Sequence, residues 1–293
     1  MKYRFILEHS EHPVTKWAEK LQVDRSGYYS WRKSRESREN REAYLKDRIR
    51  EEFDKSRGTY GPDRIVKELR KAGDSIGRGK CASYMTDMEL ESCHNRHKTK
   101  SLTNSKKSRG DGYPRILGKE VFPTVPRMGL VSDITYIRTS EGFMYHCVIK
   151  DVVGGDVLGD YMADRMTKEL AINAMLAVLA RHELPEGCIF HSDRGSQYTS
   201  KAFMALLKQY GIRQSFSRVG MPGDNSWAES FFATMKKELI HWTHFETKAQ
   251  AREKVFEYIY CFYNVTRIQK RLGYLSPKQY LRSLEIEGLE AVA

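Results

Sequence analysis

The feature that most constrains this chain is a run of alternating strand-like and helix-like patterns between residues 129 and 239. β-Branched and aromatic side chains mark the strands, and apolar residues at helical spacing mark the helices. One helix has Ser200 as its cap and Gly211 as its stop. The expected strands are 129–139, 142–152, 156–163, 187–193 and 212–218, and the expected helices are 167–182, 200–211 and 226–239.

The order of these elements indicates a fold. The first three strands read as an antiparallel meander, and then helix, strand, helix, strand and helix follow. This is the element order of a ribonuclease-H-like α/β sheet. We therefore expect a five-stranded mixed sheet with helices over residues 121–245, followed by a C-terminal helical segment, 246–293.

The N-terminal portion, residues 1–91, reads as helical. Residues 14–34 predict a helix, a short turn and a second helix capped by Ser26, and residues 61–73 and 77–90 predict another pair. The residues between the two pairs mix both charge signs, which is typical of a solvated helix. A helix-turn-helix can place one helix in a major groove of DNA, so this portion is expected to bind DNA. The pattern does not say which helix does so.

The net charge of +12 and the isoelectric point of about 9.3 indicate a polyanionic partner. No stretch has the roughly 18 consecutive apolar residues that a membrane span needs, and the N-terminus lacks the apolar core of a signal peptide. We therefore expect nucleic acid rather than membrane, and a cytoplasmic location.

The basic excess lies toward the N-terminus. Residues 1–120 carry 29 Lys and Arg against 19 Asp and Glu, whereas residues 121–293 carry 21 against 19. Residues 92–120 read as a basic linker, in which Lys106 and Lys107 are expected to lie along DNA phosphates.

The five cysteines are widely spread and include no C-x-x-C pair, so reduced thiols are expected rather than a disulfide framework. Cys93, His94 and His97 form the one cluster with zinc-like spacing, and only the distant Cys81 could supply a fourth ligand. A zinc site is therefore the less favoured interpretation.

Three acidic residues stand at positions that suggest catalysis. Asp133 lies inside the first expected strand, where aspartate is disfavoured and a buried charge is costly. Asp193 directly follows another strand, at the carboxyl end where α/β folds tend to build their sites. Glu229 opens the last helix of this region. The chain places 59 residues between the first two acids and 35 between the second and the third.

A cluster of carboxylates needs a compensating charge, because neighbouring negative groups repel and resist ionisation together. Oxygen ligands of this kind suit Mg²⁺, and Mn²⁺ fits them as well. Two such ions about 4 Å apart can drive in-line phosphoryl transfer on a nucleic-acid backbone. We therefore expect Asp133, Asp193 and Glu229 to be catalytic and to bind two ions.

Glu229 also has a structural interpretation, since Ser226-x-x-Glu229 has the pattern of a capping box. Catalysis is favoured because all three acids fall at suggestive positions on one expected sheet. Lys236 lies seven residues further on, within about 20° of the same helix face, and is expected to contact DNA.

Four blocks of the sequence resemble the signature blocks of a known family, the retroviral-integrase-like transposases of IS-three-type bacterial insertion sequences, and specifically their catalytic OrfB protein. The N-terminal stretches RSGYYSWRKS and GTYGPDRIVKELRKAG resemble the same proteins, so the likeness covers nearly the whole chain. The four blocks are SDITYI, HSDRGSQYTS, DNSWAESFFATMKKEL and FYNVTRIQKRLGYLSPKQY.

The resemblance implies a DDE transposase in which Asp133, Asp193 and Glu229 match the metal-binding acids and Lys236 matches a basic residue on the same helix. It implies cleavage at terminal inverted repeats, joining of the 3′-hydroxyl to target DNA, and a companion protein, OrfA, often fused by frameshifting. A homo-oligomer on DNA is expected.

Other positions in the resembling blocks carry further expectations. Arg267 and Arg271, in the C-terminal block, are candidates for phosphate contact. Leu130 and Gln269 depart from the family, which often has tryptophan and usually has histidine there. Two alternatives stay open: a metal-dependent nuclease of the same fold, and a catalytically decayed DNA-binding regulator.

Overall fold

The computed structural model describes residues 1–95, 114–117, 120–218 and 222–290. The chain forms two compact units, Met1–Ser92 and Cys93–Ala293. Each unit is described by itself. None of the helices in the described ranges is both long enough and apolar enough to cross a lipid bilayer.

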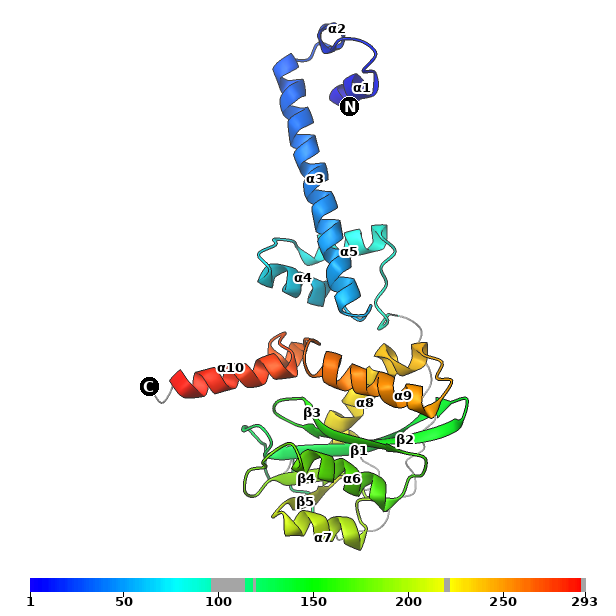
Figure 1. The fold of residues 1–293 in the computed structure, drawn as a ribbon. Helices are drawn as coiled ribbons and strands as arrows, with labels where there is room; N and C mark the ends of the chain where they lie inside the picture. The colour runs from blue at the N-terminus through cyan, green and yellow to red at the C-terminus, as the bar shows by residue number, and fades with distance from the viewer. Residues whose placement is uncertain (96–113, 118–119, 219–221, 291–293) are drawn as a thin grey trace. The chain divides into compact units, whose positions relative to one another are not determined.

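The N-terminal unit is built along one long helix (Figure 1). Its start is capped by Asp24, whose carboxylate accepts a hydrogen bond of 2.8 Å from the Gly27 N–H, so the expected cap at Ser26 was wrong by two residues. The short helix and the solvated helix expected after residue 24 are one continuous helix. The five helices are α1 (Lys2–Glu8), α2 (Val14–Lys20), α3 (Arg25–Lys55), α4 (Pro62–Lys71) and α5 (Arg78–Asp87).

The second unit contains the expected five-stranded mixed sheet, in the order β3-β2-β1-β4-β5. β1, β2 and β3 form the antiparallel meander, while β1 pairs parallel with β4 and β4 pairs parallel with β5. The strands are β1 (Gly129–Thr139), β2 (Gly142–Asp151), β3 (Val157–Ala163), β4 (Ile189–Ser192) and β5 (Arg213–Phe216).

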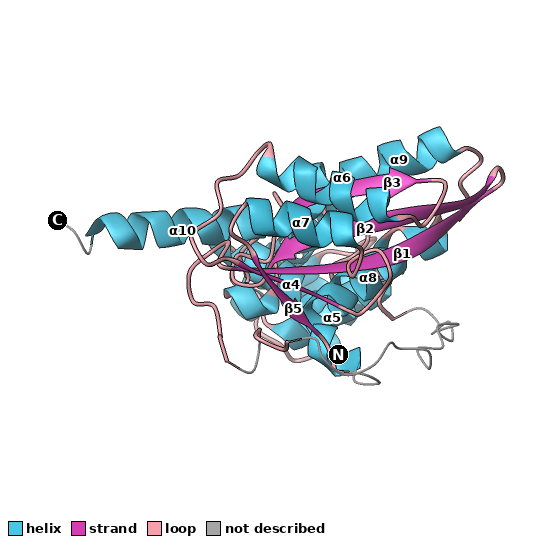
Figure 2. Cartoon of the chain, turned by 90° about the horizontal axis from the view of Figure 1, so that it is seen from below, coloured by secondary structure: helices cyan, strands magenta, loops and turns pink. Residues whose placement is uncertain are grey.

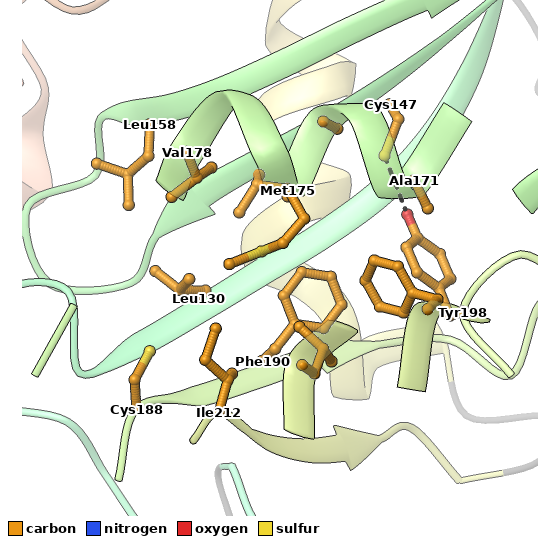
Figure 3. Packing of buried hydrophobic residues seen from close by; sticks show 14 of the residues in the cluster. Leu130, Cys147, Leu158, Ala171, Met175, Val178, Cys188, Phe190, Tyr198 and Ile212 are labelled. Atoms are coloured by element: carbon orange, nitrogen blue, oxygen red, sulfur yellow. Dashed lines mark hydrogen bonds between the residues drawn. The ribbon is translucent and has the colours of Figure 1, made fainter. Parts of the chain in front are cut away.

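Helices cover both faces of this sheet (Figures 1 and 2). α6 and α7 pack on one face, in a core that includes Leu130, Phe190 and Tyr198 (Figure 3). The expected cap of α7 is present, since the Ser200 hydroxyl accepts a hydrogen bond from the Phe203 N–H. α8 and α9 pack on the other face. The helices of the unit are α6 (Lys168–Leu179), α7 (Lys201–Gln209), α8 (Ser226–Glu238), α9 (Lys248–Phe256) and α10 (Pro277–Glu290).

The chain after α8 completes the second core rather than standing apart from the sheet. Ile137 and Met144 of the sheet pack with Phe245, Val255 and Tyr258 in one buried cluster. α9 continues directly into a π-helical stretch, Glu257–Tyr263, which supplies more of the aromatic side chains in this cluster. α8 is therefore held between the sheet and the C-terminal segment.

Gly159 allows α6 to approach β3 closely. A Cβ atom there would lie 2.9 Å from the Val178 main-chain nitrogen and 3.0 Å from the Ala174 carbonyl oxygen. Main-chain atoms inside a helix cannot rotate away, so we expect Gly159→Ala to destabilise the protein by about 1–3 kcal/mol. Chemical denaturation would measure this loss. Gly79→Ala is the matched control because nothing lies within 4 Å of its added Cβ, and equal stability of the two variants would contradict the prediction.

Candidate active site

The strand register brings two of the three acids together. Val131 of β1 pairs with His191 of β4 in a parallel ladder, and Asp133 and Asp193 each lie two residues further along. Because neighbouring strands run roughly 4.8 Å apart, this register sets the two aspartates side by side at the end of the β4 ladder.

Both aspartates belong to the sheet face that α8 covers. Side chains alternate between the two faces along a strand, so Asp133 shares a face with Val131. By the same alternation Asp193, directly after β4, lies on the same side as Ile189. Val131 and Ile189 pack with Ala228 of α8 in one buried cluster. Glu229 directly follows Ala228 and therefore lies next to this contact between α8 and the sheet.

Asn225 fixes the start of α8 beside Asp133. Its buried side chain donates a hydrogen bond of 3.0 Å to the carbonyl of Ser132. α8 begins at Ser226 without any side-chain cap hydrogen bond, so the capping box read from the sequence does not form. The Glu229 side chain is exposed and is not used to cap the helix.

Burial raises the pKa of all three carboxyl groups, and repulsion from the other two acids adds to this at Asp133. Burial is the main cause that raises the pKa of Asp133 to about 7, and the charges of Asp193 and Glu229 raise it further. The Ile134 N–H and the charge of Lys236 act in the opposite direction on the same carboxyl. Desolvation also raises the pKa of Asp193 and of Glu229. The site thus concentrates negative charge in a partly desolvated place.

A tight turn orients the Asp193 carboxylate. The Gly195 N–H donates a hydrogen bond of 2.9 Å to its Oδ1. The side chain remains in contact with water, although enough protein surrounds it to raise its pKa. Further along the same loop, the Tyr198 hydroxyl lies 2.8 Å from the Ser132 hydroxyl, which ties the loop to β1 next to Asp133.

Across the described ranges, no three His, Cys, Asp or Glu side chains already stand in positions that would hold a metal ion between them. The zinc-like cluster shows a different use for one member, because His94 Nε2 lies 2.6 Å from Glu238 Oε1. Cys93 is buried, and His97 lies outside the described residues.

Apart from Arg267, the expected DNA-contacting residues fall into three groups. Lys236 lies near the acids, with its Nζ 5.8 Å from the ring centroid of Tyr136. Arg271 is exposed, and one of its guanidinium nitrogens donates to the carbonyl of Val152. Lys106 and Lys107 lie outside the described residues.

Arg267 requires a correction. Its side chain is 6% exposed and its guanidinium forms hydrogen bonds of 2.7 Å to both carboxylate oxygens of Glu238, whose side chain is 0% exposed. A guanidinium held in this way is not available to a DNA phosphate. Arg267 therefore stabilises the fold, and the expectation of DNA contact does not hold for it.

Sequence reasoning missed Asn225, which sits in a stretch read only as a turn. It also missed the partners of Asp224, whose carboxylate forms ion pairs with Arg218 and Arg115. These pairs hold the turn that leads into α8. The sequence does show an asparagine directly before the expected helix. It cannot show the partner of that side chain, because the Ser132 carbonyl is 93 residues away in the chain.

Family comparisons agree with this architecture. An Integrase core domain model matches residues 124–222, a second Integrase core domain model matches residues 229–283, and an HTH-like domain model matches residues 39–98. The match at 39–98 includes α4 and α5, and it starts after the first expected helix pair.

Several relatives share about a third of their residues with this chain. Transposase InsF for insertion sequence IS3A of Escherichia coli strain K12 is 35% identical, over 96% of this chain and 98% of that protein. The 31 kDa protein of insertion element IS600 of Shigella sonnei is 36% identical, over 88% and 94%. The transposase for IS904 of Lactococcus lactis is 35% identical, over 72% and 83%.

Among solved structures, the BIV integrase catalytic core matches 55% of this chain and 98% of its own, at 18% identity and a TM-score of 0.39. The HTLV-2 integrase catalytic core in complex with magnesium matches 54% and 97%, at 15% identity and a TM-score of 0.41. The curated relatives and the family models are the stronger findings, and on them the chain belongs to the IS3 family of insertion-sequence transposases, DDE-type polynucleotidyl transferases with an integrase core.

Proposed function

We propose that this chain cuts DNA strands at the ends of its element and joins the freed 3′-hydroxyl to target DNA, with Asp133, Asp193 and Glu229 as its catalytic residues. The observation that carries the proposal is the pairing of β1 with β4, because it sets two aspartates side by side on the face covered by α8. Glu229 is the residue after Ala228, through which α8 contacts that face.

The donor set suits a divalent cation. All three side chains offer carboxylate oxygens, the ligands that Mg²⁺ and Mn²⁺ prefer. Burial raises the pKa of Asp133 and its two acidic neighbours raise it further, so a cation would relieve an existing repulsion. We propose that the three acids hold two Mg²⁺ ions, which when bound activate the attacking oxygen and stabilise the leaving oxygen of an in-line phosphoryl transfer.

The chain's own groups orient these acids. The Ile134 N–H donates a hydrogen bond of 2.8 Å to Oδ1 of Asp133, as the Gly195 N–H does to Oδ1 of Asp193. Main-chain donors thus fix the rotation of both carboxyl groups. Glu229 is exposed on the first turn of α8, where its longer side chain can turn toward the aspartates on binding.

DNA is the partner of this enzyme class, and we propose four residues that contact it. Lys236 is close enough to Asp133 for its charge to oppose the rise in the pKa of that carboxyl, so we propose that it contacts DNA next to the reacting phosphate. Arg271, Lys106 and Lys107 are proposed to contact phosphates further away. Recognition of the terminal repeats is proposed to need an OrfA companion or fusion, with a homo-oligomer assembled on DNA at the nucleoid.

The proposed activity assigns a role to each part of the chain. Residues 1–91 are proposed to bind DNA, residues 92–120 to link, residues 121–245 to carry catalysis and residues 246–293 to form a C-terminal segment. The burial of that last segment against β1 and α8 supports a role in holding the catalytic helix.

The direct test incubates the purified chain, with and without its companion, on a labelled element-end duplex in Mg²⁺. Wild type is compared with Glu229→Gln and with the exposed control Glu186→Gln. We expect nicked and joined products from the wild type and the control, and none from Glu229→Gln. Undiminished product from Glu229→Gln would contradict the assignment. Cutting without joining would indicate a nuclease, and binding without product in the wild type would indicate a decayed regulator.

Gly195→Ala tests the orientation of Asp193. A Cβ atom at this position would lie 2.9 Å from Oδ1 of Asp193 and 3.0 Å from Oε1 of Gln197. The short aspartate side chain must then turn, so we expect strand cleavage to fall by about tenfold or more, since a misplaced catalytic group is costly. Melting temperature and DNA affinity should stay close to those of the wild type. Full cleavage activity in the variant would show that this turn does not position the carboxylate.

A further inference from the structure

The N-terminal end of α3 carries a small helical module that the HTH-like match at 39–98 does not include. α1 and α2 lie beside the first turns of α3 (Figure 1). Only residues 21–24 separate α2 from α3, and Gln22 adopts a left-handed conformation (φ 48°) that makes the turn tight. The Val23 N–H closes it with a hydrogen bond of 3.0 Å to the carbonyl of Ala18.

An aromatic core holds this module together. The Tyr3 ring lies 6.1 Å from that of Tyr28 and 5.8 Å from that of Trp31, which joins α1 to α3. Phe5 meets Trp17 edge to face at 5.1 Å, which joins α1 to α2. Tyr28 is 2% exposed. One side of α3 is therefore buried against the two shorter helices, and the side next to it faces water.

The neighbouring exposed side is basic. Arg25, Tyr29, Arg32 and Lys33 are all exposed and follow one another at helical spacing, so they form one stripe on α3. No acidic residue occurs between Arg25 and Arg35. The nearest acid, Asp24, is engaged in capping the helix. Cations around a partly exposed tyrosine suit a surface of phosphates and stacked bases.

We propose that this module is a second DNA-binding site, which places the stripe Arg25–Tyr29–Arg32–Lys33 in a major groove. The inference rests on the proposed function and deepens it. Two helices joined by a turn of three or four residues have the geometry that presents the second helix to the groove. The exposed tyrosine, 49% accessible, supplies the contact with bases, and the three cations supply the contacts with phosphates.

The length of α3 sets the distance between this module and the second one. α4 and α5 pack near the other end of the helix, where Lys46 forms an ion pair of 3.3 Å with Asp87 of α5. At about 1.5 Å per residue, the 18 residues from Tyr28 to Lys46 span roughly 27 Å. Successive major grooves on one side of B-DNA lie about 34 Å apart. The separation of the modules is shorter than the groove repeat but large enough for the two modules to cover separate stretches of DNA.

The test measures the salt dependence of binding of the full chain to duplex DNA, together with its footprint. Arg32→Ala/Lys33→Ala removes two cations of the stripe, and the control Lys208→Ala/Arg213→Ala removes two exposed cations from α7 and β5. We expect the slope of log affinity against log salt to fall by about two only in the first variant. Its footprint should lose one of two protected patches. Tyr29→Ala should weaken binding without changing the slope.

Equal slopes in wild type and Arg32→Ala/Lys33→Ala, or equal losses in the two double variants, would overturn the inference. A single protected patch in the wild type would do the same. Failure of the proposed function looks different: wild type would show both patches and the full slope but give no nicked or joined product. All substituted side chains are exposed, so circular dichroism should report an unchanged fold in each variant.

Discussion

Asp133→Asn is expected to abolish strand cleavage and, in the absence of metal, to make the protein more stable. Loss of one of three proposed metal ligands should lower the cleavage rate by about 10³-fold or more, because the ions supply several kcal/mol of transition-state stabilisation. The gain in stability has a separate cause. Burial raises the pKa of Asp133 to about 7 from 3.8, so its ionised form is unfavourable in the folded protein.

The sign of the pH dependence follows from that shift. An acid with a raised pKa in the folded state costs no stability below its unfolded pKa of 3.8, and its cost grows until pH passes about 7. Asp133→Asn should therefore unfold at higher denaturant than the wild type at pH 8, by roughly 2–4 kcal/mol, and the difference should shrink toward pH 4.

Denaturation with and without Mg²⁺ separates the two effects. Mg²⁺ should stabilise the wild type and have little effect on Asp133→Asn, since ligands that bind only the folded state stabilise it. The control, Asp47→Asn, removes an exposed carboxylate from α3 and should alter neither stability nor cleavage. A variant that is inactive and less stable at every pH would indicate a purely structural role for Asp133.

Glu238→Gln is expected to produce the largest loss of stability. The buried Glu238 carboxylate binds the Arg267 guanidinium, accepts a hydrogen bond of 2.8 Å from the Tyr258 hydroxyl and lies 2.6 Å from Nε2 of His94. Removing its charge leaves Arg267 buried without a counterion, which typically costs about 3–5 kcal/mol. Chemical denaturation against the exposed control Glu253→Gln would measure the loss.

Two further results are specific to this ion pair. Burial alone would raise the pKa of Glu238. The charge of Arg267 and the hydrogen bonds from Arg267, His94 and Tyr258 outweigh it and lower that pKa to about 2 from 4.5. Its stabilisation is therefore complete above pH 4.5 and is lost as pH falls toward 2, so the difference between wild type and Glu238→Gln should narrow over that range. Glu238→Gln/Arg267→Met should lose less than the sum of the two single variants, and strict additivity would refute the coupling.

The sequence predicts most of the fold because the relevant signals are local. Each of the five strands and each of the helices α6, α7 and α8 has its own periodicity, and the Ser200 cap needs only its neighbour Phe203. The α/β order then leaves few topologies. Asp133 could be named as a candidate because an aspartate inside a strand is unusual in the sequence alone. Asp193 and Glu229 could be named because they follow a strand and open a helix of the same expected sheet region.

The errors arise where a side chain has a choice of distant partners. Arg267 was predicted to bind phosphate because the sequence does not show that Glu238, 29 residues earlier, becomes its ion-pair partner in the folded protein. The capping box at Ser226 and Glu229 fails because Asn225 is held by the carbonyl of Ser132, which alters the entry into α8. The long α3 was divided into two because its mixed charges hide where one helix ends.

The central position of β1 in the sheet affects when activity can first arise during synthesis. β1 bears Asp133 and must wait for β4, nearly 60 residues later in the chain, and then for α8 and the C-terminal segment that packs over it. Contacts at such long sequence separation form late in folding. A nascent chain therefore lacks the assembled acids until the C-terminal segment has left the ribosome, and we expect a protein truncated before α8 to cut no DNA.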